Sequence, residues 1–130
     1  MTTKEIGDLG EKLSVKLLRK KHYKVLKRNL HVSHNELDIV AFHRKTKMIV
    51  FVEVKTRSVG KDLYSPFGTP GAAVNRSKQK RTVDAAKDYL RSNFGKWSKL
   101  QPRIDVIEVY LSKADRSLLN INHIENAFGV

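Results

Sequence analysis

Hydrophobic residues recur at helical spacing near the start of the chain and at strand spacing in its middle. Residues 4–21 carry apolar side chains three and four positions apart, which predicts an amphipathic helix with Thr3 as candidate N-cap. Three strands are expected to follow, at 23–32, 37–43 and 48–55. The third is apolar on both faces until Glu53, as expected of a central strand that is covered on both sides.

Glycine and proline then interrupt the pattern, and residues 58–71 are expected to form a long loop. Residues 72–94 predict a second helix, and its expected buried stripe comprises Val83, Ala86, Tyr89 and Leu90. A strand of alternating type at 103–111 and a weaker one at 118–124 complete the chain. The order α-β-β-β-α-β-β predicts an α/β fold in which helices flank a central mixed β-sheet, in one domain spanning 1–130.

The composition limits the possible chemistry and location. The 130 residues include no cysteine, so disulfides, zinc–thiolate sites and thiol catalysis are excluded. No segment approaches the roughly 18 apolar residues of a membrane span, and the first ten residues do not resemble a signal peptide. We therefore expect a cytoplasmic protein that has no membrane partner.

The charge points to a polyanionic partner. Lys and Arg total 26 against 13 acidic residues, for a net charge of +13. The excess is concentrated in residues 1–35 and 72–101, which contain the two expected helices. Nucleic acid is the favoured partner, and an anionic membrane surface or plain solubility is the alternative.

Two acidic residues are expected to meet on neighbouring strands. A turn centred on Lys45 and Thr46 would place Asp38 directly opposite Glu53, with Lys55 on the same face. Two carboxylates in such a position repel each other unless a proton or a cation lies between them, and Mg²⁺ would satisfy both. The alternative is a charged strand end, with Glu53 and Lys55 as a solvated pair.

At this point the sequence resembles a known group. Asp38 followed by Glu53-Val54-Lys55 resembles the PD-(D/E)xK nuclease pattern. The likeness extends to the YraN-like family of predicted nucleases, which are related to archaeal Holliday-junction resolvases. The further segments that carry the resemblance are Gly7–Glu11, Arg28-Asn29, Glu36–Ile39, Phe51–Arg57, Lys78, Arg103–Val106 and Asn126–Phe128.

The resemblance implies a restriction-endonuclease-like core and assigns roles to individual residues. It implies Glu11, Asp38 and Glu53 as ligands of Mg²⁺ or Mn²⁺, and Lys55 as the catalytic lysine. One departure is Asn35, which stands where the family usually has glycine before Glu36. Asparagine tolerates a positive φ better than most residues, so the turn is expected to survive.

Several residues keep two interpretations. Glu36 either assists the metal site or is an exposed strand start, and Phe94 and Trp97 either stack on bases or cap the core. Asp105 is expected to bond to a structural neighbour such as Arg103 rather than to act in catalysis. Four basic or polar residues either bind phosphate or are simply solvated: Arg28, Arg57, Lys78 and Gln79.

The sequence thus favours a metal-dependent endonuclease that hydrolyses phosphodiester bonds in DNA, including branched or junction DNA. Paired cuts at a junction would require a symmetric homodimer. The alternatives are a nucleic-acid-binding module without turnover and a structural or partner-binding protein in DNA processing.

Overall fold

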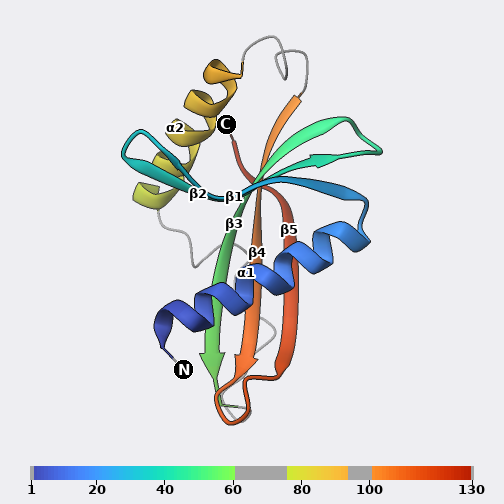
Figure 1. Ribbon diagram of the computed structural model, residues 1–130, viewed down its shortest axis with the longest axis vertical. Coiled ribbons are helices and arrows are strands. Elements are labelled where there is room, and N and C mark those ends of the chain that lie inside the picture. The colour runs from blue at the N-terminus through green and yellow to red at the C-terminus, as the bar shows by residue number, and fades with distance from the viewer. Residues whose placement is uncertain (1, 61–75, 94–100, 130) are drawn as a thin grey trace.

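The computed structural model describes residues 2–60, 76–93 and 101–129, and it confirms the expected order of elements (Figure 1). The elements are α1 (Thr3–Lys20), β1 (Tyr23–Val32), β2 (Asn35–His43), β3 (Met48–Val59), α2 (Arg76–Ser92), β4 (Gln101–Ser112) and β5 (Leu118–Phe128). The strands form one mixed sheet in the order β1-β2-β3-β4-β5, in which only β3 and β4 pair in parallel. The connection between these parallel strands contains α2, as a crossover requires.

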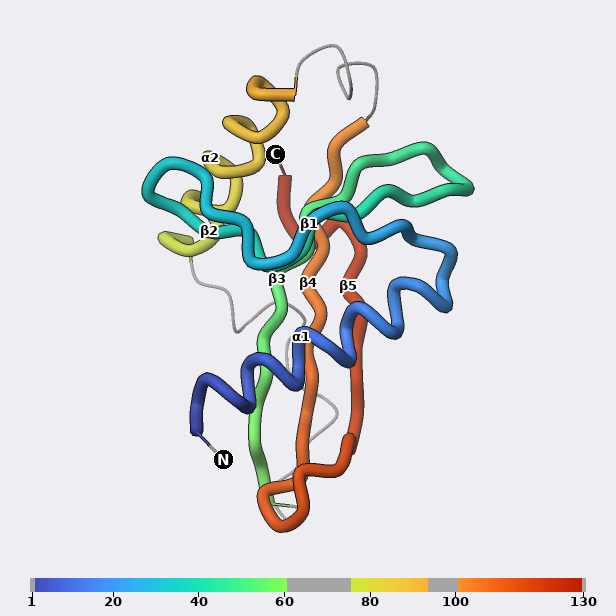
Figure 2. Tube along the Cα trace, in the orientation of Figure 1, coloured from blue at the N-terminus to red at the C-terminus, as the bar shows by residue number. Residues whose placement is uncertain are grey.

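The two helices cover opposite faces of the sheet. Val15 and Leu18 of α1 pack with Val50 and Val52 of β3, in one apolar cluster. Ala85, Ala86 and Tyr89 of α2 pack in a second cluster, which contains Ile49 and Phe51. Because successive strand residues point to opposite faces, the alternation along β3 assigns the clusters to the two sides. Figure 2 shows α1 lying across the long strands.

Element ends differ in part from the expectations. The N-cap of α1 is Thr2 rather than Thr3, and a capping box joins Thr2 to Glu5. β3 continues to Val59, into the segment expected to be a loop. β4 is buried on both faces over most of its length rather than alternating, because β3 and β5 flank it and residues from both clusters cover it. Positions 61–75 and 94–100 lie outside the described residues, including the rest of the expected loop, the ends of the expected second helix and the Phe94–Trp97 pair. Among the helices in the described parts of the chain, none has a stretch sufficiently long and apolar to cross a membrane.

A close approach brings α1 onto β3. A Cβ atom at Gly10 would lie 1.8 Å from the side-chain oxygen of Thr56, so only glycine fits there. A Cβ atom at Gly7 would meet nothing within 4 Å. Gly10 therefore sets the distance between helix and strand, and it brings the next residue, Glu11, to the second half of β3.

The expected register between β2 and β3 is confirmed. Residues 44–47 make the turn, and the pairs run from His43 with Met48 to Ile39 with Val52. Beyond that pair the two strands separate, and β3 continues beside β4 alone (Figure 1). Asp38 and Glu53 are the next residues on the two strands, so they stand where the sheet divides.

The expected positive φ falls at a different residue. Ser33 in the β1–β2 turn has a φ of 55°, whereas Asn35 is not among the residues with positive φ. Asn35 is instead the first residue of β2 and pairs with Val32. The turn that precedes Glu36 therefore depends on Ser33.

Candidate metal and nuclease site

The Asp38 side chain accepts a backbone hydrogen bond at the point where β2 and β3 stop pairing. The backbone N–H of Val54 donates to Oδ2 of Asp38 at 2.9 Å. The described β2–β3 pairs end before Val54, so β2 offers it no backbone carbonyl as an acceptor. The bond anchors the Asp38 side chain beside Glu53.

Glu53 is a buried carboxylate that is only half satisfied. Its side chain lies on the α2 face, and Nζ of Lys78 is 3.1 Å from Oε1. The second oxygen, Oε2, is buried and has no hydrogen-bond partner among the described residues. Burial, and next the charge of Asp38, raise the pKa of Glu53 to about 7, although Lys78 opposes the shift.

The pKa of Asp38 is raised as well, mainly by burial, while the hydrogen bond from Val54 and the charge of Lys78 act in the opposite direction. Two neighbouring carboxyl groups that both resist ionisation hold a proton near neutral pH unless a cation replaces it. A bound cation would therefore relieve the repulsion within this pair.

Glu11 reaches the same region from α1. Its side chain is buried, and Oε1 accepts a hydrogen bond from Nε of Arg28 at 3.0 Å. Burial raises the pKa of Glu11, the Arg28 pair lowers it and Asp38 adds to the rise. Arg28, expected to bind nucleic acid, thus has a carboxylate partner within the protein.

A cavity of about 370 Å³ is shared by Glu11 and Asp38, whereas Glu53 is not among the described residues that line it. Its lining includes Glu11, Asn29, Asp38 and Lys55, and Lys55 is exposed to solvent. Asn29 had no predicted role of its own and belonged only to the Arg28-Asn29 segment that carries the family resemblance. Its φ of 49° is the left-handed conformation that asparagine tolerates, and the residue type was the only available signal.

The donor set suits a hard divalent cation. Within the described residues no three histidine, aspartate or glutamate side chains come close enough to hold a metal together. Mg²⁺ needs only one or two carboxylates, because water and substrate phosphate complete its coordination. Asp38 and Glu53 supply oxygen ligands, and among the described residues the buried Oε2 of Glu53 has no hydrogen-bond partner.

Comparison with known proteins places the chain in a family. Residues 10–109 match the model of the Uncharacterised protein family UPF0102. The chain belongs to this family. UPF0102 is the YraN-like group that the sequence motifs resemble.

Relatives of this UPF0102 member are similar over their full length. A UPF0102 protein of Caldanaerobacter subterraneus is 41% identical over 125 residues, which are 96% of this chain and 95% of that one. A UPF0102 protein of Alkaliphilus oremlandii is 44% identical over 125 residues, covering 96% and 98% of the two chains. Among solved structures, Pyrococcus furiosus SfsA in complex with Ca²⁺ is similar with a TM-score of 0.43 and 16% identity, and the alignment covers 98% of this chain and 65% of that chain.

The remaining residues expected in the site of this UPF0102 member are spread around the acidic pair. Lys78 binds Glu53, and Gln79 follows it on α2 and is half-buried. Arg57 is exposed on β3, two residues beyond Lys55. Glu36 is exposed, and its charge contributes to the raised pKa of Asp38.

Asp105 belongs to a separate, structural network. It accepts hydrogen bonds from Arg103 at 2.8 Å, from Nε2 of His123 at 2.7 Å and from the backbone of Asn126 at 2.9 Å. The expected bond to Arg103 is confirmed. Burial alone would raise the pKa of Asp105, but these hydrogen bonds outweigh it and the pKa is lowered.

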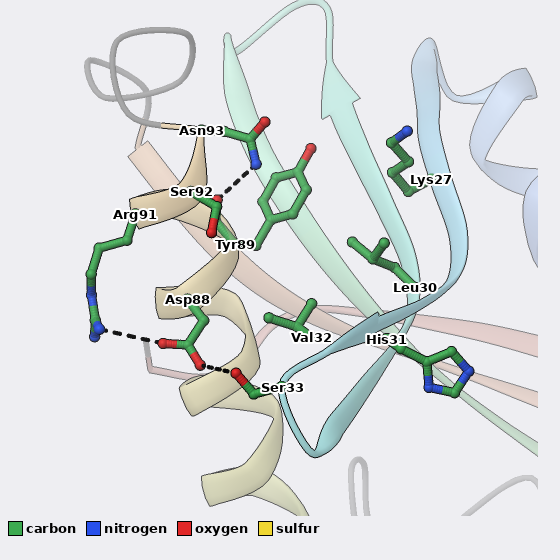
Figure 3. Close-up of a pocket in the computed structure, with 10 residues that line it drawn as sticks. All are labelled: Lys27, Leu30, His31, Val32, Ser33, Asp88, Tyr89, Arg91, Ser92 and Asn93. Carbon is green, nitrogen blue, oxygen red and sulfur yellow. Dashed lines mark hydrogen bonds and ion pairs between the residues drawn. The ribbon is translucent and has the colours of Figure 1, made fainter.

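A larger cavity lies away from the acidic pair. It has a volume of about 600 Å³ and lies between the C-terminal part of α2 and β1 (Figure 3). Asp88 in its wall already contacts Arg91 and Ser33. These contacts join α2 to the β1–β2 turn, and the cavity contains neither Asp38 nor Glu53.

Proposed function

We propose that this UPF0102 member is a metal-dependent endonuclease that hydrolyses phosphodiester bonds in DNA at the Asp38–Glu53 pair. One observation carries the proposal: in the part of the chain that the structure describes, a buried oxygen of Glu53 has no hydrogen-bond donor while a second carboxylate lies beside it. A structural pair would be satisfied by donors, and a cation site is the arrangement that leaves acceptors facing each other.

Each side chain of the site has a role that follows from its position. Asp38 and Glu53 would hold Mg²⁺ or Mn²⁺, and Glu11 lines the same cavity as Asp38. The bound ion would supply positive charge for the reacting phosphate. The Val54 N–H donates to Asp38 and keeps that side chain oriented beside Glu53.

Lys55 faces the substrate side of this site. Its side chain is exposed and borders the cavity, so its ammonium group can contact a phosphate oxygen and stabilise negative charge that develops there. Arg57 extends the basic edge along β3. The net charge of +13 favours a polyanionic substrate over a small phosphate ester.

The decisive experiment combines cleavage with a matched variant. Linear, nicked and four-way-junction DNA are incubated with the protein in Mg²⁺, Mn²⁺ or chelator. We expect metal-dependent products from the wild type and from Glu125→Gln, in which the same change is made at an exposed carboxylate. Glu53→Gln should give no product while its DNA affinity is retained.

Two results would count against the proposal. If no substrate is cut with either metal, the enzyme assignment is wrong. If Glu53→Gln still cuts, the site assignment is wrong.

A DNA-binding protein without turnover is the second candidate. The observation that favours it is the Lys78 ammonium, 3.1 Å from Glu53, which already provides a positive charge. In that case Mn²⁺ would not raise the melting temperature of the wild type, although DNA binding would still weaken steeply as salt rises.

A further inference from the structure

A second surface of the molecule is a groove lined mainly by cationic side chains. It runs beside α1 toward β1, has a volume of about 770 Å³ and is here called the α1 groove. Five of its eight lining residues are cationic, namely Lys12, Lys16, Arg19, Lys20 and Arg28. The other three are apolar, namely Leu9, Leu13 and Val15. No acidic residue is among the described residues that line it.

The cations form a regular row. Lys12, Lys16 and Lys20 are spaced four residues apart, so they share one side of α1 at intervals of about 6 Å. Within the described residues, no ion pair joins these lysines or Arg19 to a carboxylate. A row of like charges without counter-charges favours a ligand with regularly repeated negative charge over a compact anion.

The α1 groove also lies next to the cavity that Asp38 lines. Arg28 lines the groove, and its partner Glu11 lines the cavity that contains Asp38 and Lys55. One ion pair at 3.0 Å therefore separates the two surfaces. A strand that lies along α1 would reach the cavity by passing Arg28.

We propose that the α1 groove binds the sugar–phosphate backbone of a DNA strand next to the position that is cut. The lysines contact phosphates, and Leu9 and Leu13 provide an apolar floor for the deoxyribose rings. The choice of DNA rests on the proposed nuclease function, whereas the polyanionic nature of the ligand follows from the groove itself. The sequence predicted only that the basic segments favour nucleic acid and named Arg28 alone among these lining residues, so the groove adds the four cations of α1 as individual contacts.

The test measures binding without cleavage. A fluorescently labelled DNA duplex is titrated with protein in chelator, at several salt concentrations. The double variant Lys12→Gln/Lys16→Gln should bind at least about 10-fold more weakly at low salt. The slope of log affinity against log salt should become shallower by about 2, since each lost phosphate contact removes about 1. Lys16→Gln alone should remove about 1.

The matched control removes two charges elsewhere. Lys87 is exposed on α2, on the opposite face of the sheet, and Lys113 is exposed in the β4–β5 turn. Neither lines the groove, so Lys87→Gln/Lys113→Gln should retain most of the slope. Both double variants alter exposed side chains, and unchanged melting temperatures would establish that they fold.

The outcomes separate this inference from the proposed function. A slope loss confined to the groove variant supports the groove, even if no DNA is ever cut. Equal losses in both double variants would overturn it, because the effect would then come from overall charge. An unchanged slope in the groove variant would also overturn it and would leave an acidic peptide as the ligand to test, without affecting a cleavage result.

Discussion

In the metal-free protein the Asp38–Glu53 pair should lower the free energy of unfolding. The substitution Glu53→Gln should remove this loss. Glutamine keeps an oxygen for Lys78 and places an amide donor opposite Asp38. Folding raises the pKa of Glu53 from 4.5 to about 7, mainly by burial. That difference corresponds to about 3 kcal/mol, because one pKa unit is worth about 1.4 kcal/mol.

The direction of the pH dependence follows from the raised pKa. The folded state holds the proton of Glu53 more tightly than the unfolded state. The wild type therefore loses stability as pH rises from about 4.5 through 7, and it carries the full penalty above 7. Near pH 4 both proteins are neutral at this position and should be equally stable.

Urea denaturation in chelator between pH 4 and 8 measures the effect. We expect Glu53→Gln to be more stable than the wild type by up to about 3 kcal/mol at pH 8, or about 10 °C in melting temperature. Mn²⁺ should stabilise the wild type and should not stabilise the variant. The control Glu125→Gln should differ little from the wild type at any pH, since its side chain is exposed. A Glu53→Gln protein that is less stable than the wild type at pH 8 would refute the reasoning.

Four further substitutions test other contacts. Gly10→Ala, whose Cβ would lie 1.8 Å from a threonine oxygen of β3, should lower the free energy of unfolding by about 1–3 kcal/mol. Gly7→Ala, in open space, should raise it by about 0.5–1 kcal/mol, and equal effects in urea would contradict this account. Asp105→Ala leaves Arg103 buried without its carboxylate and should cost about 3–5 kcal/mol at pH 7. Its pKa is lowered, so the difference from the wild type should shrink as the pH of the urea titrations falls below 4. Lys55→Met should reduce DNA cleavage at least about 100-fold while Mn²⁺ still raises the melting temperature, and a lost thermal shift would place Lys55 in metal binding.

Periodicity within single elements determined most of the architecture from sequence. The spacing of apolar residues located both helices and all five strands, because helix and strand present side chains with different periods. The same argument predicted the meeting of Asp38 and Glu53. With the turn at residues 44–47, the alternation of side chains between the two faces of each strand allows only one pairing register for the hairpin.

Contacts between distant elements were decided by the tertiary structure. Lys78 reaches Glu53 from α2, and Arg28 reaches Glu11 from β1, so two residues with a predicted role in phosphate binding also pair with acids. The Asp105 network likewise extends to Tyr23 and His123 through contacts that no local pattern contains. These contacts depend on how the helices pack onto the sheet. The spacing of residues along the sequence describes only the single helix or strand in which it occurs, so it cannot predict contacts between elements. For the same reason the α1 groove was predicted only in part: the sequence assigned its lysines to a basic helix, but Arg28 completes the groove only where β1 lies beside that helix.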